Sequence, residues 1–416
     1  MAITIEQKPN YSVIPIGQDV IFSVSDSTVL ASHFNVRFYC DVMFSSTTEA
    51  LQSKIVTLKT TPNAAGSGIF DLRRALESEL SADYTLDSDN NNVRFKGDSN
   101  VVDAPIHHIE MLSTSKNVSG NFTCNFYVKG SVSASSSVLT VGSVVSSDSF
   151  FVYNGQPDAN DPLTNTSGDY HYDLDAMGLF QNSSTSQFLS GLPTTIYARR
   201  SDVGTVGFFQ AMSNFYPGYT GVVNISFKFY NSSDNLLLEI PLSTGTAQGG
   251  TASTGSTTDS TRASLFLGVY PGNIRQFLSL PSTLSYYTFN GESLAGVSKT
   301  KLYRVNIIEE CSHPVTRLCW LNKFGTWDYY NFTVKSTKST SATRKFYNAS
   351  RGDWSGSKFR HTHYKGGKTV YKMDSTDSMV LNTDYLTEEE GVWLESLMTS
   401  TEVFLIKEGN TWDIGE

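Results

Sequence analysis

Two groups of side chains have the residue types and spacing that metal sites use. His361 and His363 are separated by one residue, so in a strand both imidazoles would lie on one face. A structural zinc site uses four ligands, and no third ligand is obvious nearby. Asp169, Asp173 and Asp175 could offer carboxylates to calcium, but the spacing and terminal glutamate of an EF-hand loop are missing. We interpret the histidines as structural or surface side chains and the aspartates as a polar loop, and we expect no bound metal.

Common catalytic motifs are absent from the sequence. It contains no Gly-x-Ser-x-Gly, His-Glu-x-x-His or P-loop pattern, and no Gly-x-Gly-x-x-Gly between a predicted strand and a helix. Without these motifs, no residue can be assigned as a nucleophile, a general base or a phosphate ligand. We therefore expect that the protein is not an enzyme and uses no cofactor.

Charge is unevenly distributed along the chain. The formal net charge is −9, but residues 335–372 contain ten basic residues and one acid, which leaves −18 for the rest. The basic residues that we predict to contact a neighbouring subunit are Arg344, Lys345, Arg351, Lys358, Arg360, Lys365 and Lys368. Six aromatic residues are interleaved with them, namely Phe346, Tyr347, Trp354, Phe359, Tyr364 and Tyr371. A cationic segment on an anionic body is suited to docking onto an identical neighbour, because complementary charge steers association and fixes register.

The basic segment has two other interpretations. It could be a hairpin that folds back onto the acidic domains of its own chain. It could also bind single-stranded nucleic acid, where bases stack on aromatic rings and phosphates meet cations. The acidic balance of the whole chain argues against a general affinity for nucleic acid or acidic membranes. We therefore expect no nucleic-acid partner.

Aromatic side chains are also dense between Cys319 and Phe332, where the pattern predicts a strand, a turn near Gly325 and a second strand. The candidate subunit contacts in this aromatic hairpin are Trp320, Phe324, Trp327, Tyr329 and Tyr330. Aromatic residues often anchor protein interfaces. Packing in the core of the chain itself is the alternative. Trp354 is a separate candidate for stacking against a sugar ring.

Alternation of apolar and polar residues predicts the strands that carry these side chains. It is clearest over residues 35–44 and 223–229. One order occurs twice: strand, strand, Gly/Pro turn, short helix, strand, Gly/Ser loop, strand. We therefore predict two related β-sandwich units. In the first unit, Ile69, Leu72, Leu76 and Leu80 recur at helical spacing and predict a short amphipathic helix.

We predict an all-β protein of mainly antiparallel β-sandwich domains with a small α+β module at its C-terminal end. The first sandwich spans residues 1–150. The second spans residues 151–310, with a mobile loop at 243–262 that lacks apolar residues to anchor it. Residues 311–416 hold the aromatic hairpin, the basic segment, a helix that begins at a Thr387–Glu390 capping box, and a final hairpin.

The cysteines and the lengths of the apolar runs indicate the cellular compartment in which the protein is made. Cys40 and Cys124 each lie on the apolar face of a predicted strand, where buried free thiols and a cross-sheet disulfide are both open. The first residues have no apolar h-region, and no run approaches the 18 apolar residues of a membrane helix. We expect synthesis in a cytoplasm and no membrane partner.

Three blocks of this sequence resemble tail-associated structural proteins of tailed bacteriophages from marine and Bacteroidetes-type hosts. They are FNVRFYCDVMFSS followed by LKTTPNAAGSGIFDLRRALESEL, the block from Cys311 to Phe332, and LNTDYLTEEEGVWLESLMTSTEVFLI. Together they cover about a quarter of the chain, in the family's order, but the middle sandwich has no such resemblance. The resemblance implies a structural component of the virion, near the tail, neck or baseplate, that is assembled in the host bacterial cytoplasm.

We therefore expect a homo-oligomer that binds copies of itself and other virion proteins. The alternatives are a carbohydrate-binding module that recognises a glycan on the host surface and a protein that decorates the head. A glycan hydrolase carried on the virion is a further rival, which would need a pair of carboxylates in a groove.

Overall fold

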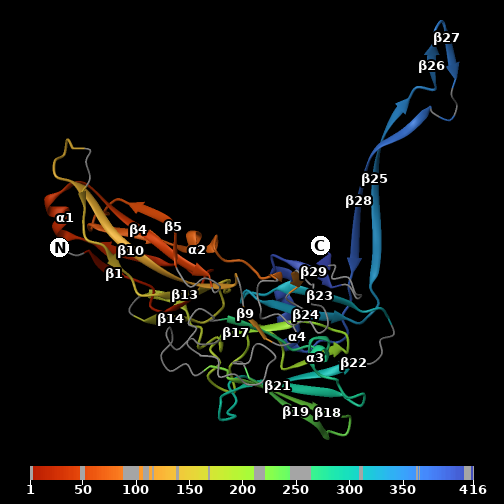
Figure 1. Ribbon diagram of the computed structural model, residues 1–416. Helices are drawn as coiled ribbons and strands as arrows, with labels where there is room; N and C mark the ends of the chain where they lie inside the picture. The colour runs from red at the N-terminus through yellow and green to blue at the C-terminus, as the bar shows by residue number, and fades with distance from the viewer. Residues whose placement is uncertain are drawn as a thin grey trace. The chain divides into compact units, whose positions relative to one another are not determined.

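The computed structural model is shown in Figure 1. It describes residues 3–46, 52–87, 103–105, 112–114, 117–136, 140–166, 169–209, 221–243, 264–308, 313–361, 364, 366–406 and 414–415. Within these residues the chain is built mostly of strands in mainly antiparallel sheets, with four short helices. This confirms the predicted all-β fold class. Among the described helices, none is long and apolar enough to cross a bilayer.

The contacts divide the chain into two units. Unit 1 comprises Met1–Glu309, Leu318–Tyr330 and Thr387–Glu416, and unit 2 comprises Glu310–Arg317 and Asn331–Leu386. The sequence-based division at residues 150 and 310 stays a prediction. Apart from Ser243, which ends a strand, the predicted mobile loop lies outside the described residues.

The first sandwich of unit 1 packs a large sheet against a small one. The large sheet has the order β2 (Val13–Pro15), β13 (Phe150–Tyr153), β10 (Ser119–Ser131), β4 (Phe34–Ser46) and β5 (Ser53–Thr60), and β11 (Thr140–Val141) and β12 (Val145–Ser146) also pair with β10. The small sheet is β1 (Thr4–Gln7), β3 (Ile21–Ser25) and β6 (Ser67–Asp71). Side chains along β10 alternate between buried and half-buried, as a strand with one face on a core requires. The rings of Phe22 and Phe70 lie 5.4 and 5.8 Å from the Phe126 ring between the sheets.

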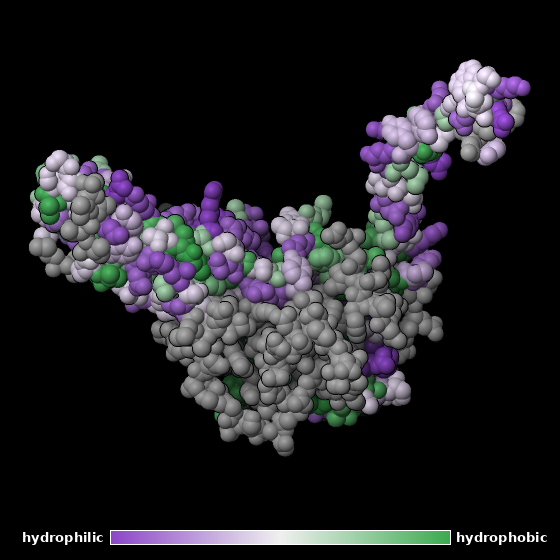
Figure 2. All heavy atoms as spheres, turned by 45° about the horizontal axis from the view of Figure 1, so that its top comes forward, coloured by the Kyte–Doolittle hydropathy of each residue, from purple (hydrophilic) through white to green (hydrophobic). Residues whose placement is uncertain are grey.

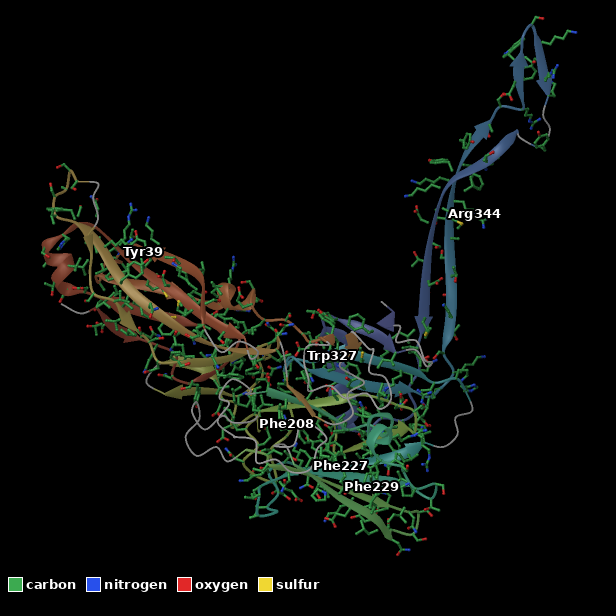
Figure 3. All side chains as sticks on the ribbon, viewed as in Figure 1. Tyr39, Phe208, Phe227, Phe229, Trp327 and Arg344 are labelled. Carbon is green, nitrogen blue, oxygen red and sulfur yellow. The ribbon has the colours of Figure 1, made fainter. Side chains whose placement is uncertain are left out.

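A second pair of sheets follows in the same unit. Its large sheet has the order β16 (Thr195–Arg199), β22 (Tyr303–Ile308), β21 (Tyr286–Glu292), β18 (Asn224–Tyr230) and β19 (Leu236–Ser243). Its small sheet is β17 (Thr205–Phe209), β20 (Ser264–Gly268) and β9 (Leu112–Thr114). Residues of both sheets bury one core, which includes Phe208, Phe227 and Phe229, labelled in Figure 3.

The two sandwiches share the strand order of their large sheets and one strand pair of their small sheets, β3–β6 and β17–β20, whereas the third strands differ: β1 pairs with β3, and β9 pairs with β20. In each large sheet the first strand runs parallel to its neighbour, β2 beside β13 and β16 beside β22, and the next pairings are antiparallel. In each small sheet a strand is followed by a short helix, α2 (Arg73–Glu77) after β6 and α3 (Pro271–Phe277) after β20. The repeated order of elements in the sequence therefore corresponds to a repeated fold.

A stacked pair of tyrosines with a nearby cation lies across equivalent strands of the two large sheets, although the cations come from strands that are not equivalent. Tyr39 stacks on Tyr127 across β4 and β10, and the ammonium of Lys129 lies 4.9 Å from the Tyr39 ring. Tyr230 stacks on Tyr286 across β18 and β21, and the Arg304 guanidinium lies 3.6 Å from the Tyr286 ring. Cross-strand aromatic pairs stabilise neighbouring strands, and a cation over a ring adds to this.

The structure corrects the predicted helix over Ile69 to Leu80. Ile69 belongs to strand β6, where it pairs with Ser23 and its side chain is exposed, and only Arg73–Glu77 form the helix α2. Leu72 and Leu76 are buried as predicted. The first apolar residue of the helical pattern is thus used by the sheet, because pairing with β3 satisfies its backbone polar groups.

The cysteines that the structure describes, Cys40, Cys124 and Cys319, are buried free thiols, and Cys311 lies outside the described residues. Cys40 and Cys124 are neighbours on the inner face of β4 and β10. The hydrogen-bonding contact with Cys124, together with burial, raises the pKa of the Cys40 thiol.

A further sheet is formed by strands from the C-terminal part of the chain. Its order is β24 (Trp327–Phe332), β23 (Thr316–Leu321), β29 (Val403–Ile406) and β30 (Ile414–Gly415). Helix α4 (Glu388–Thr399) begins at the predicted capping box, because the Thr387 hydroxyl accepts a hydrogen bond from the Glu390 backbone and the Glu390 carboxylate accepts one from the Thr387 backbone. The remaining elements are α1 (Ser27–Ser32), β7 (Thr85–Asp87), β8 (Asp103–Pro105), β14 (Leu163–Thr166) and β15 (Asp169–Tyr172).

Candidate docking arm

Unit 2 consists mainly of a long two-stranded ribbon with a smaller strand pair at its tip, and we call these four strands the arm. Strand β25 (Thr337–Ala349) pairs antiparallel with β28 (Gly367–Val380), and β26 (Gly352–Ser355) pairs with β27 (Lys358–His361) between them. In the described residues no further strand joins either pair. Thirteen residues at about 3.3 Å each give the β25–β28 ribbon a length of roughly 40 Å. The blue ribbon is visible in Figure 1.

Polar contacts hold the base of the arm. Arg317 is buried, and its guanidinium donates a hydrogen bond of 3.0 Å to the Asn331 side chain. The Asn382 amide donates to the Lys335 carbonyl at 2.8 Å. The first bond joins β23 to β24, and the second joins the chain that enters the ribbon at Lys335 to the chain that leaves it at Asn382.

The described side chains of the arm are almost all exposed. Every described residue of β25 except Ala349 is exposed, as are most of those in β28. The alternation of buried and exposed side chains that marks β10 is absent here, so neither face of the ribbon covers a core.

The strand register assigns each side chain of the arm to one of two faces, because directly paired residues lie on the same side of a sheet. We call these the Arg344 face and the Lys345 face. The Arg344 face carries Lys338, Thr340, Ala342, Arg344, Phe346 and Asn348 from β25, with Lys368, Val370, Met373, Ser375, Asp377 and Met379 from β28. The Lys345 face carries Thr337, Ser339, Ser341, Thr343, Lys345 and Tyr347, with Thr369, Lys372, Asp374, Thr376, Ser378 and Val380.

A bulge separates the two halves of the ribbon. Lys345 pairs with Lys372 and Phe346 with Val370, so Tyr371 is the extra residue. Its ring contacts that of Tyr347 at 6.3 Å, on the Lys345 face. On the opposite face, the Lys368 ammonium lies 4.6 Å from the Phe346 ring. Figure 3 shows side chains standing out on both sides of the ribbon near Arg344.

The tip of the arm presents an aromatic cluster. Trp354 pairs with Phe359, and their rings lie 5.5 Å apart in an edge-on arrangement. The Phe359 ring also contacts the His361 imidazole at 5.0 Å. The indole of Trp354 is 75% exposed, which leaves a face open for stacking. The turn needs Gly356, whose φ of 61° is a left-handed conformation that glycine adopts without strain.

The structure separates the predicted contact residues into two groups. Among the basic ones, Arg344, Lys345, Arg351, Lys358, Arg360 and Lys368 are exposed on the arm, and Lys365 lies outside the described residues. Four residues of the aromatic hairpin, Trp320, Phe324, Trp327 and Tyr329, are instead buried within unit 1. These four residues pack in the core, as the alternative interpretation of the hairpin expects. Side chains that fill the core of their own chain are not available to a neighbouring subunit. Tyr330 is half-buried and packs edge-on against Trp393.

The structure describes part of each of the two groups that we considered as metal ligands. Asp173 caps a turn, because its carboxylate accepts hydrogen bonds from the backbone of Asp175 and Ala176 at 3.1 and 2.9 Å. His361 belongs to the aromatic tip, and His363 lies outside the described residues. These contacts fit the interpretation of Asp173 as part of a polar loop.

Sequence reasoning did not single out Asp328, a buried carboxylate of β24. It accepts hydrogen bonds from the Ser190 hydroxyl at 2.5 Å, the Trp393 indole at 2.8 Å and the Asn322 amide at 3.0 Å. Burial raises the pKa of Asp328 to about 6, and the hydrogen bonds oppose this rise. A signal was present in the sequence, since Asp328 is the one acid within the aromatic run from Trp327 to Phe332.

Asp328 and Trp393 line a pocket of about 960 Å³ beside α4. Its walls include Leu192, Val392 and Phe324, and its carboxylates include those of Glu388, Glu389 and Glu395. Lys323, also in the lining, forms ion pairs with Asp158 and Asp161 at 3.1 and 2.7 Å. The Asp328 carboxylate accepts hydrogen bonds from several side chains, and the bond from the Trp393 indole connects α4 to the aromatic hairpin.

Comparison with known proteins gives no family for this chain. No family model matches the sequence, and no curated protein matches it.

Proposed function

We propose that the protein is a structural component of a bacteriophage virion that assembles by docking its arm onto neighbouring subunits. The partners are copies of itself and other virion proteins, at the tail, neck or baseplate. The three sequence blocks that resemble phage tail-associated proteins support the proposal that the chain is part of a phage particle. The exposed arm supports the mode of assembly.

The observation that carries this proposal is the length and exposure of the arm. A two-stranded ribbon in water is marginally stable by itself, and it needs a further strand or a packed face to become stable. The β25–β28 ribbon has neither among the described residues, yet it exposes Phe346, Val370, Met373 and Met379 by 41% or more. An interface with another subunit would cover these side chains. Figure 2 shows hydrophobic and hydrophilic residues interleaved along the ribbon.

Sedimentation velocity over a range of protein and salt concentrations tests the proposal. We expect oligomers at low salt that dissociate as salt rises, because the Debye length falls from about 30 Å at 0.01 M to about 3 Å at 1 M. A fluorescent single-stranded oligonucleotide should not bind under the same conditions. A chain that stays monomeric at high concentration and low salt would contradict the proposed assembly.

The aromatic tip supports a second candidate function, recognition of a host glycan. Trp354, the tryptophan of the arm, is exposed, and its ring contacts that of Phe359. Exposed rings of this kind stack on sugars in many carbohydrate-binding proteins. A glycan array with the wild type and with Trp354→Ala distinguishes the two functions, since glycan binding that is lost in the variant would favour recognition. Cleavage of host polysaccharide by the purified protein would instead indicate an enzyme.

The location of the protein within the virion requires a separate measurement. Immunogold labelling of purified particles with an antibody against the chain locates it on the tail, the baseplate or the head. Label distributed over the head would favour the decoration alternative.

A further inference from the structure

The two faces of the arm are chemically different. On the Arg344 face, Ala342, Phe346, Val370 and Met373 form an apolar stripe beside Arg344, and Met379 lies beyond Thr340, Ser375 and Asp377 on the same face. On the Lys345 face, the middle of the ribbon carries the hydroxyls of Ser339, Ser341, Thr343, Thr376 and Ser378. Ser339 and Ser378 hydrogen-bond each other at 2.7 Å across the strands. Burying the apolar stripe releases water, whereas burying the hydroxyl row has a desolvation cost unless each hydroxyl finds a partner.

The charges of the two faces differ in their surroundings. Arg344 is paired across the ribbon with Met373, and it makes no ion pair with another described residue. Lys345 is opposite Lys372, whose ammonium pairs with Asp374 at 3.1 Å. A guanidinium amid apolar side chains is suited to a carboxylate from outside the ribbon, because arginine binds carboxylates in a planar, bidentate manner.

We propose that the arm docks through its Arg344 face, and that the surface it covers belongs to a second copy of this chain. This inference rests on the proposed function and specifies which face is buried. Charge complementarity selects the occupant: residues 335–372 carry +9, and the rest of the chain carries −18. The apolar stripe packs against the neighbour, Arg344 pairs with one of its carboxylates, and the hydroxyl row stays in water.

Arg344→Glu and Lys345→Glu form a matched pair of variants that tests the choice of face. Both residues are exposed, they are adjacent in β25, and the two substitutions change the net charge equally. A long-range electrostatic effect would therefore be the same in both. We expect Arg344→Glu to weaken self-association by at least about tenfold, as loss of an interface anchor does. Lys345→Glu should change it by less than about threefold, as is usual for a charge outside the interface core.

A second matched pair removes ring area without changing charge. We expect Phe346→Ser on the Arg344 face to weaken self-association, and Tyr347→Ser on the Lys345 face to leave it nearly unchanged. Circular dichroism and thermal unfolding check that all four variants retain the fold. Equal losses in both members of each pair, or losses only on the Lys345 face, would overturn the choice of face.

Mixing full-length chains tests the occupant. The Phe346→Ser chain keeps the body surface onto which a neighbour's arm docks, so the wild type should capture it with undiminished affinity in co-sedimentation, although the variant associates only weakly with itself. Arm-to-arm docking predicts the opposite result, weakened capture, because the altered arm would then lie in every mixed contact. Failure of this inference leaves the proposed function standing as long as the wild type still assembles, whereas a monomeric wild type would end both.

Discussion

Asp328 is a carboxylate that the fold places among aromatic side chains, where it loses most of its contact with water. Three side chains donate hydrogen bonds to it, and these favour the ionised form. Desolvation outweighs them, which is why the pKa rises. The residue joins α4 to the aromatic hairpin, so its protonation state affects how firmly the helix is held.

The raised pKa of Asp328 predicts a particular dependence of stability on pH. The folded chain binds this proton more tightly than the unfolded chain, so the contribution is present at pH 4 and below and is lost as pH rises through about 6. Urea unfolding of the wild type and of Asp328→Asn from pH 4 to 7 isolates the contribution of Asp328 to the free energy of unfolding. The wild type should lose on the order of 3 kcal/mol relative to the variant over this range. Parallel curves for the two proteins would contradict the assignment.

The residues of the arm are compatible with β-strands, but their side chains do not form a hydrophobic core. Its serines and threonines alternate with basic and apolar residues, and the register places the hydroxyls of the middle section on one face. Like charges at Lys345 and Lys372 lie directly opposite each other, an arrangement that weakens a ribbon. Such an element has little stability of its own and depends on what covers it.

Hydrogen exchange of the arm should therefore depend on protein concentration. In the dilute monomer we expect the backbone amides of β25 and β28 to exchange rapidly, while those of β10, which lies over a core, stay protected. In the assembled protein the ribbon should be protected. Mass spectrometry of exchanged peptides at two concentrations measures this, with the β10 peptide as the internal control. Equal protection of the arm in both samples would argue against docking.

The whole molecule combines a repeated sandwich body with one cationic arm. Docking the arm of one copy onto the body of the next uses two different surfaces, so the interface is heterologous. Interfaces of this kind produce closed rings or open filaments, because every bound copy still offers a free arm or a free acceptor.

Species larger than a dimer should therefore form. Negative-stain imaging of the wild type at low salt should show rings or filaments, and light scattering should give masses above twice 45.8 kDa. The Arg344→Glu chain gives the control, which should form fewer and smaller assemblies at the same concentration. A population that stops at the dimer would indicate a symmetric contact and would contradict heterologous docking.

The sequence by itself determined the all-β class, the repeated order of strands and the capping box of α4. These follow from local rules, alternation with a period of two and hydrogen bonds within one turn, which neighbouring residues decide. It also located the basic, aromatic segment, because charge and ring content can be counted along a chain.

Only the tertiary structure decided which aromatic residues are buried. Trp320 and Trp354 look alike in sequence, yet Trp320 fills the core beside Trp393 and Trp354 stands in solvent at the tip. Burial depends on what packs against a strand from elsewhere in the chain, as α4 does here. The same applies to Asp328, whose partners Ser190 and Trp393 are distant in sequence. The two faces of the arm likewise required the pairing register and its bulge, because one extra residue decides which side chains share a face.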